Sequence, residues 1–231
     1  MFGGRPGDEE LANNLLKDAD ELLSGGPPPA VAFCIDTSGS MVSGNRIANA
    51  RHELCRILDL YLKPGQVFSI WSFNHQVRQI IPSSIRPDTS VELQGVFDRI
   101  MSLWPGGGTA MYNAMDMALN DLNRFVPPDG SRPFMVVLTD GEDNMAMPAF
   151  KNNVIQSLVR YRYKVIIIGI RLSPMIRREM EYIVECANAP VNEDGSMYVD
   201  VSSDDSSTLS EAFERVGKSI KESMTLSIEQ Y

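Results

Sequence analysis

Short apolar segments recur along the chain and are separated by longer amphipathic ones. Segments of four to eight apolar residues are typical of strands that are buried on both faces of a sheet. Two other segments read as strands because they are rich in aromatic and β-branched residues. A turn at Asn74-His75 predicts a hairpin, so that the strand after it would be antiparallel to the one before it. The predicted strands are residues 31–35, 67–73, 76–81, 133–138, 164–170 and 197–201.

Between these strands, apolar residues recur every three or four positions, as in helices with one buried face. The predicted helices are residues 45–62, 91–103, 109–125, 145–162, 174–187 and 209–223. Alternation of strands and helices is typical of an α/β fold, in which crossover connections make neighbouring strands parallel. The sequence therefore predicts a doubly wound, mostly parallel central sheet of about six strands, with one antiparallel edge strand and helices on both faces.

The predicted domain organisation has three parts. Residues 1–29 form an N-terminal extension, with an amphipathic helix at 8–23 followed by a Gly- and Pro-rich linker that ends it. Residues 30–222 form the α/β domain, and residues 223–231 a C-terminal tail. The N-terminal helix has two open interpretations: it folds back on the domain surface, or it docks onto a partner protein.

Charge and composition narrow the choice of partners and compartment. The net charge of -9 argues against a nucleic-acid backbone or an anionic membrane as partner, and it is compatible with a cation or a basic protein surface. The 231 residues contain no apolar run long enough for a transmembrane helix, and the first residues do not resemble a signal peptide. The three cysteines lack metal-ligand spacing, which favours reduced thiols, so we expect a cytoplasmic protein.

Oxygen-bearing side chains follow two of the buried strands directly. Asp36, Ser38 and Ser40 lie within five residues after the strand 31–35, and Asp140 follows the strand 133–138. Carboxylates and hydroxyls are the ligands that hard divalent cations prefer. Ligands of parallel α/β sheets bind beyond the carboxyl ends of the strands, at the point where the strand order reverses. On the residues alone, Asp140 remains either a metal ligand or the start of an Asx turn.

The Asp-x-Ser-x-Ser pattern of Asp36 to Ser40 resembles the metal-ion-dependent adhesion site of von Willebrand factor A-type domains. That family adds a Thr from a second loop and an Asp at the end of a later strand, for which Thr109, after the Gly-rich segment 105–108, and Asp140 are the candidates. The resemblance covers most of the chain. It implies a Rossmann-like fold in which the strands 31–35 and 133–138 are adjacent. The metal residues it implies are Asp36, Ser38, Ser40, Thr109 and Asp140.

The resemblance also implies a cofactor and a partner. The cofactor is a divalent cation, Mg²⁺ in the first place, with Mn²⁺ or Ca²⁺ as alternatives. A protein partner would supply an Asp or Glu carboxylate to the cation, with Trp104 as an aromatic contact and Glu142, Asp143 and Asn144 at the rim. On the residues alone, however, we expect Trp104 to pack onto the domain and Glu142, Asp143 and Asn144 to be simple solvated loop residues. No nucleic acid, membrane or small-molecule substrate is expected.

Other readings of these residues remain. Thr109 is also suited to cap a helix, and His75 is more typical of an exposed turn than of a metal ligand. The Gly-rich loop lacks the Lys of a nucleotide-binding loop. We therefore predict a non-enzymatic, metal-dependent protein-binding module without catalytic residues. One alternative is a scaffold subunit with a structural or unused metal site. A metal-assisted hydrolase is less favoured, because Ser38 stands where an aspartyl-nucleophile pattern needs a second Asp and no His or Lys is near in sequence to act as acid.

Overall fold

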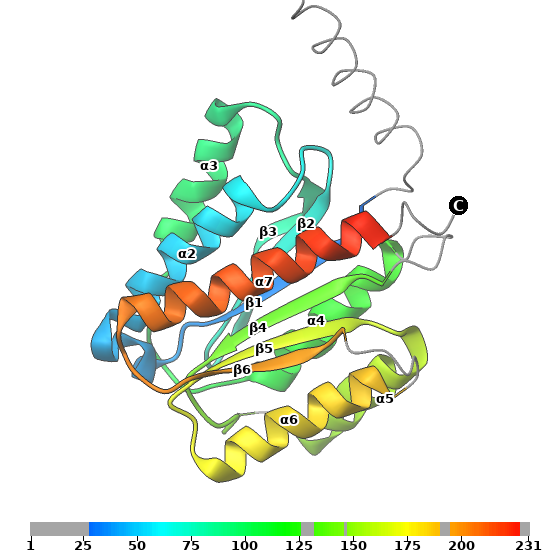
Figure 1. Cartoon of the computed structure of the whole chain (residues 1–231). Helices are drawn as coiled ribbons and strands as arrows, with labels where there is room; N and C mark the ends of the chain where they lie inside the picture. Colours follow the sequence, from blue (N-terminus) through cyan, green and yellow to red (C-terminus); the bar gives the residue numbers. More distant parts are fainter. Residues whose placement is uncertain (1–27, 126–131, 146, 190–194, 227–231) are drawn as a thin grey trace, which may run out of the picture.

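The computed structural model describes residues 28–125, 132–145, 147–189 and 195–226, which form one six-stranded sheet with helices on both faces (Figure 1). The strand order is β3-β2-β1-β4-β5-β6. All neighbouring strands pair in parallel except β2 and β3, which form an antiparallel hairpin at one edge. The strands are β1 (Val31–Asp36), β2 (Val67–Phe73), β3 (Val77–Ile85), β4 (Phe134–Thr139), β5 (Lys164–Ile170) and β6 (Met197–Val201).

Helices cover the sheet from both sides. The 3-10 segments η1 (Gly39–Asn45) and η2 (Asn123–Phe125) precede α2 and follow α4, respectively. The helices are α2 (Arg46–Leu60), α3 (Ser90–Met101), α4 (Met111–Leu122), α5 (Pro148–Tyr161), α6 (Pro174–Asn188) and α7 (Ser206–Leu226). Residues of α2, α3 and α7 pack in the hydrophobic core on one face, and residues of α4, α5 and α6 pack in the core on the other.

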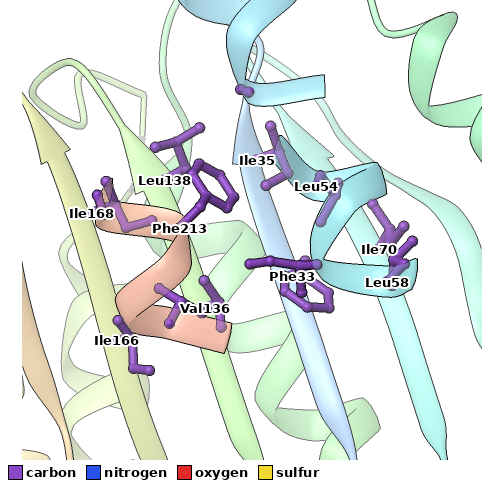
Figure 2. Close-up of a cluster of buried hydrophobic side chains, with 14 of the residues drawn as sticks. Phe33, Ile35, Leu54, Leu58, Ile70, Val136, Leu138, Ile166, Ile168 and Phe213 are labelled. Atoms are coloured by element: carbon purple, nitrogen blue, oxygen red, sulfur yellow. The ribbon is translucent and has the colours of Figure 1, made fainter. Parts of the chain in front are cut away.

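The central strand β1 contributes to both cores because successive side chains of a strand point to opposite faces. Phe33 and Ile35 join the core under α2 and α7, whereas Ala32 and Cys34 join the core under α4. Figure 2 shows the first of these cores, in which Phe213 of α7 lies against the strand residues. The other labelled members are Leu54, Leu58, Ile70, Val136, Leu138, Ile166 and Ile168.

This architecture confirms the predicted fold class, including the adjacency of β1 and β4. The hairpin strand was predicted too short: the sequence indicated a loop from Pro82 onward, but β3 continues to Ile85. A proline is tolerated there because β3 is an edge strand, where one side of the backbone has no partner strand. Helix α7 runs to Leu226, four residues into the stretch predicted as a tail.

The structure does not test two of the sequence expectations, the N-terminal helix and the domain boundaries. The amphipathic segment 8–23 lies outside the described residues, and the predicted domain boundaries stay predictions. Within the ranges that the structure describes, no helix combines the length and apolar character needed to cross a bilayer.

Candidate metal site

Two carboxylates meet at the carboxyl end of the sheet. Asp36 is the last residue of β1, and Asp140 directly follows Thr139, the last residue of β4. These strands are neighbours, and it is between β1 and β4 that the strand order changes direction. Both carboxylate side chains are inaccessible to solvent, with Asp36 0% exposed and the Asp140 side chain 0% exposed.

Asp36 is held by one neighbour in the loop after β1 and by one at the end of β4. Its Oδ1 accepts a hydrogen bond from the backbone N–H of Ser38 at 2.7 Å, and its Oδ2 accepts one from the Thr139 hydroxyl at 2.7 Å. Burial nevertheless raises the pKa of Asp36 to about 6, despite the opposing effect of these hydrogen bonds. The negative charge of Asp140 acts in the same direction as burial. A buried pair of carboxylates is therefore an environment in which a bound cation would be favourable.

A continuous row of hydrogen bonds connects the first motif to Asp140. The hydroxyl oxygens of Ser38 and Ser40 are 2.9 Å apart, and the Ser40 hydroxyl donates to Asp140 Oδ1 at 2.6 Å. Residue 39 is glycine, and its backbone N–H donates to the Gly107 carbonyl at 3.0 Å. This close backbone contact joins the Asp36–Ser40 segment to the Gly-rich loop.

The Gly-rich loop brings Thr109 to the same place. The Gly106 N–H donates to the Thr37 carbonyl at 2.8 Å, which anchors the loop a second time. Thr109 is 4% exposed, and its hydroxyl lies 3.9 Å from the position of a Cβ built on Gly141, the residue after Asp140. Thr109 does not cap the next helix, because Ala110 is the N-cap residue of α4 and no side chain caps it. Its hydroxyl is therefore not used for capping.

The loop after β4 is more structured than the sequence suggested. The Asn144 side-chain oxygen accepts from the Thr109 N–H at 2.9 Å, and Asp143 Oδ2 accepts from the Tyr112 N–H at 2.7 Å. The Thr109 carbonyl in turn accepts from the N–H groups of Asn144 and Met145. The expectation that Asp143 and Asn144 are merely solvated is wrong, because both position the start of α4 beside Asp140.

The exposure of His75 and Trp104, which lie near the Gly-rich loop, decides between the alternatives that the sequence left open for them. His75 is exposed at the hairpin tip, as expected of a turn residue, and its ring lies against Gly107. Trp104 is 81% exposed, so the interpretation in which it packs onto the domain is wrong. A large apolar side chain is thus presented to solvent directly before the loop that carries Thr109.

Sequence reasoning missed three polar residues at this site. Thr139 holds Asp36, as described above. The guanidinium of Arg46 donates to Asp140 Oδ2 at 2.6 Å and to Asp204 Oδ1 at 2.6 Å. Arg46 and Asp204 lie 158 positions apart in the sequence, so neither spacing nor periodicity could have paired them. The position of Thr139 directly before Asp140 was the one available signal.

The donor set fits a small divalent cation. Mg²⁺ binds oxygen at about 2.0–2.1 Å in octahedral geometry, which puts neighbouring ligands about 3 Å apart. The 2.9 Å separation of the Ser38 and Ser40 hydroxyl oxygens matches that spacing. In the part of the chain that the structure describes, no group of three or more His, Cys, Asp or Glu could hold a metal. The candidate site consists instead of three hydroxyls and two carboxylates, a set of donors that suits a hard cation better than zinc.

Comparison with solved structures gives a consistent fold. A von Willebrand factor type A protein from Catenulispora acidiphila aligns with a TM-score of 0.67 at 21% identity, over 84% of this chain and 43% of that one. The PilB minor pilin from Streptococcus sanguinis aligns with a TM-score of 0.63 at 15% identity, over 87% of this chain and 63% of the pilin. The corresponding domain of the type V pili tip protein Mfa5 from Porphyromonas gingivalis has a TM-score of 0.61 at 12% identity, over 86% and 97%.

At these identities, the similarity concerns the fold. This chain spans less than two thirds of the length of the first two of these solved chains. No curated protein matches the sequence. The family model for the von Willebrand factor type A domain matches residues 30–215, which is most of the chain. The protein therefore belongs to the von Willebrand factor type A domain family.

Proposed function

We propose that this protein is a protein-binding module that recognises a carboxylate of its partner through a divalent cation held at the candidate site. The observation that carries the proposal is the convergence of Asp36, Ser38, Ser40, Thr109 and Asp140, from three separate chain segments, at the carboxyl ends of β1 and β4. Mg²⁺ is the favoured cation, and Mn²⁺ and Ca²⁺ are alternatives.

Each residue has a distinct role in this proposal. Ser38, Ser40 and Thr109 would hold the cation with neutral hydroxyl oxygens. Asp36 and Asp140 would supply the negative charge and accept hydrogen bonds from water on the cation. A cation in such a site supplies a Lewis-acidic position that an oxygen ligand from outside can complete. Ser40 is exposed, so a ligand from outside could approach the cation from this side.

The surroundings of the site support a protein as partner. Four large apolar side chains from the segments that form the site are exposed; they are Val42 (63%), Trp104 (81%), Met145 (52%) and Met147 (69%). Exposed tryptophan is enriched among residues that contribute most to binding, and methionine adapts to varied partner surfaces. The similarity to a minor pilin and to a pilus tip protein also favours an interaction module over an enzyme.

A second candidate function is a scaffold subunit whose metal site is structural or unused. One observation favours it: both oxygens of Asp140 already have partners, Ser40 on Oδ1 and Arg46 on Oδ2. A fully hydrogen-bonded carboxylate needs no metal for its own stability. A metal-assisted hydrolase has less support, because none of the five candidate residues is a His or Lys that could act as a general acid.

Thermal unfolding in EDTA and in a series of Mg²⁺ and Mn²⁺ concentrations separates the metal-dependent module from a scaffold whose metal site is unused. Cation at about 100 times its dissociation constant stabilises the native state by about 2.7 kcal/mol. For a protein of this size, we expect a rise in melting temperature of roughly 5–11 °C. Ser38→Ala, which removes one hydroxyl ligand, should abolish the rise, whereas Ser84→Ala, an exposed serine in β3, should not affect it. A wild-type protein that does not respond to any of these cations would favour the scaffold.

The carboxylate part of the proposal needs a separate test. Peptides displayed on phage can be selected on the Mg²⁺-loaded protein and eluted with EDTA. We expect the eluted peptides to share an Asp or Glu, and synthetic versions with Asn or Gln at that position not to bind. Selection of peptides without any acidic residue would contradict carboxylate recognition and leave the metal site itself unaffected.

A further inference from the structure

Arg46 connects the candidate metal site to the loop before α7 through a chain of ion pairs. Its guanidinium binds Asp140 Oδ2 and Asp204 Oδ1, each at 2.6 Å. Arg171 binds the other oxygen of Asp204 at 2.7 Å. Figure 1 shows how these segments meet, with η1 in blue beside the orange start of α7. Two negative and two positive side chains thus alternate from Asp140 outward.

The pair of Arg46 and Asp140 differs from the other pairs in its burial. The Arg46 side chain is 11% exposed and the Asp140 side chain 0%, whereas the Arg171 side chain is 55% exposed. Interactions between buried charges are weakly screened, while exposed pairs contribute little. The charge of Arg46 is therefore felt strongly at Asp140, and that of Arg171 only weakly.

We propose that Arg46 acts as a built-in counter-charge that shares Asp140 with the divalent cation, and thereby weakens cation binding while leaving the bound cation incompletely neutralised. This inference rests on the proposed function, because it assigns a role at the same site. Asp36 and Asp140 together would neutralise a divalent cation completely. With Arg46 on Asp140, part of that negative charge is already compensated, so the loaded site retains positive charge for an anionic ligand.

Asp204 moderates this effect. It draws on the same guanidinium, and its Cβ lies 2.4 Å from the position of a Cβ built on Gly44, so it is seated closely against η1. Gly44 has a φ of 57°, and a side chain at this position would collide with Asp204. The substitution Asp204→Asn removes the charge and keeps the shape of the side chain, so that the positive charge of Arg46 is paired with Asp140 alone.

The rival explanation is that Arg46 only fastens the loop before α7 to η1 and β4. The two explanations predict different signs. If Arg46 is a mere fastener, Arg46→Met and Asp204→Asn both break the same link and change cation affinity in the same direction. If Arg46 is a counter-charge, Arg46→Met tightens cation binding and Asp204→Asn weakens it.

Isothermal titration of Mg²⁺ and Mn²⁺ into the full chain tests this. We expect Arg46→Met to bind the cation roughly tenfold more tightly, equivalent to about 1.4 kcal/mol. Asp204→Asn should bind it more weakly, and Arg46→Lys, which retains the charge, should remain near wild type. Arg171→Met, which removes the exposed pair on Asp204, is the matched control and should change affinity little. Circular dichroism checks that each variant folds, and Asp204→Asn and Arg46→Lys still test the idea if Arg46→Met does not.

The outcomes distinguish this inference from the proposed function. Cation binding by the wild type with equal or weaker binding by Arg46→Met would overturn the role of Arg46 and leave the proposed function standing. Cation binding by Arg46→Met but not by the wild type would support the inference in its strongest form. An absence of binding in every variant would overturn both.

Discussion

The hydroxyl of Thr139 donates a hydrogen bond to Asp36 Oδ2 at 2.7 Å, and both residues are 0% exposed. This bond joins the ends of the adjacent strands β1 and β4 at the point where the candidate metal site begins. It also fixes which way the Asp36 carboxylate faces, because the other oxygen is held by the Ser38 N–H. Thr139 therefore acts at the site through Asp36.

Replacement of Thr139 by valine, which has nearly the same shape, should destabilise the protein. The buried carboxylate of Asp36 loses a donor, which costs about 1–3 kcal/mol. Urea unfolding in EDTA should show this as a lower midpoint with an unchanged slope. Thr139→Ser keeps the hydroxyl and should retain more of the stability. Equal loss in both variants would mean that the methyl group, rather than the hydrogen bond, is what matters.

The contrast between residues that the sequence identified and those it missed has a physical basis. Asp36, Ser38 and Ser40 are close in the chain. Because the buried strands are parallel, Asp36 and Asp140 both lie at the carboxyl end of the sheet. Strand β5 was located to the residue because an apolar run between polar ends leaves little choice. Local patterns therefore sufficed for the strands, apart from the end of β3, and for the carboxylates at their carboxyl ends. The adjacency of β1 and β4 was inferred from the family resemblance.

The features that the sequence missed depend on tertiary contacts. Arg46 contacts Asp140, 94 positions away, and Asp204, 158 positions away, and nothing in the sequence around Arg46 indicates either partner. The end of β3 was missed because Pro82 usually marks a break, and only the position of β3 at the sheet edge makes it harmless. The roles of Asp143 and Asn144 likewise required knowing that α4 begins beside them.

Gly107 should be far more sensitive to substitution than its neighbour Gly106. Gly107 has a φ of 81°, and a Cβ there would lie 2.1 Å from His75 Nδ1, whereas nothing lies within 4 Å of a Cβ on Gly106. Gly107→Ala should cost about 1–2 kcal/mol from the left-handed backbone alone. Gly106→Ala should change the free energy of unfolding by less than about 1 kcal/mol. Chemical denaturation of the two variants makes the comparison.

Variants of Gly107 and His75 separate the two causes of strain at Gly107, which are the left-handed backbone and the collision with the His75 ring. Adding His75→Ala to Gly107→Ala removes the collision but not the unfavourable φ. We expect the double variant to recover part of the lost stability. A double variant no more stable than Gly107→Ala would mean that the His75 ring moves aside freely and that the backbone conformation explains the whole effect.

Trp104 should report on the side of the site that we propose faces the partner. The chain has two tryptophans, of which Trp71 is 5% exposed and Trp104 is 81% exposed. Iodide should therefore quench one component of the fluorescence and leave the other nearly unaffected, and Trp104→Phe should abolish the quenchable component. Because Trp104 is exposed, this substitution should change stability by no more than about 0.5 kcal/mol. Quenching that persists in Trp104→Phe would contradict the exposed position of this side chain.

Variants of Ser40 test whether this residue is a metal ligand or only supports the structure of the loop. It is exposed, and its hydroxyl lies between Ser38 and Asp140, to which it donates at 2.6 Å. In EDTA, Ser40→Ala should lower the free energy of unfolding by only about 1 kcal/mol, since one hydrogen bond to a carboxylate that Arg46 still pairs is lost. In Mg²⁺, the same variant should lack the stabilisation that we expect of the wild type, whereas Ser40→Thr should retain part of it. The two variants are therefore compared by melting temperature with and without Mg²⁺. A Ser40→Ala protein that loses stability in EDTA but still gains the full increment from Mg²⁺ would show that Ser40 supports the loop and does not hold the cation.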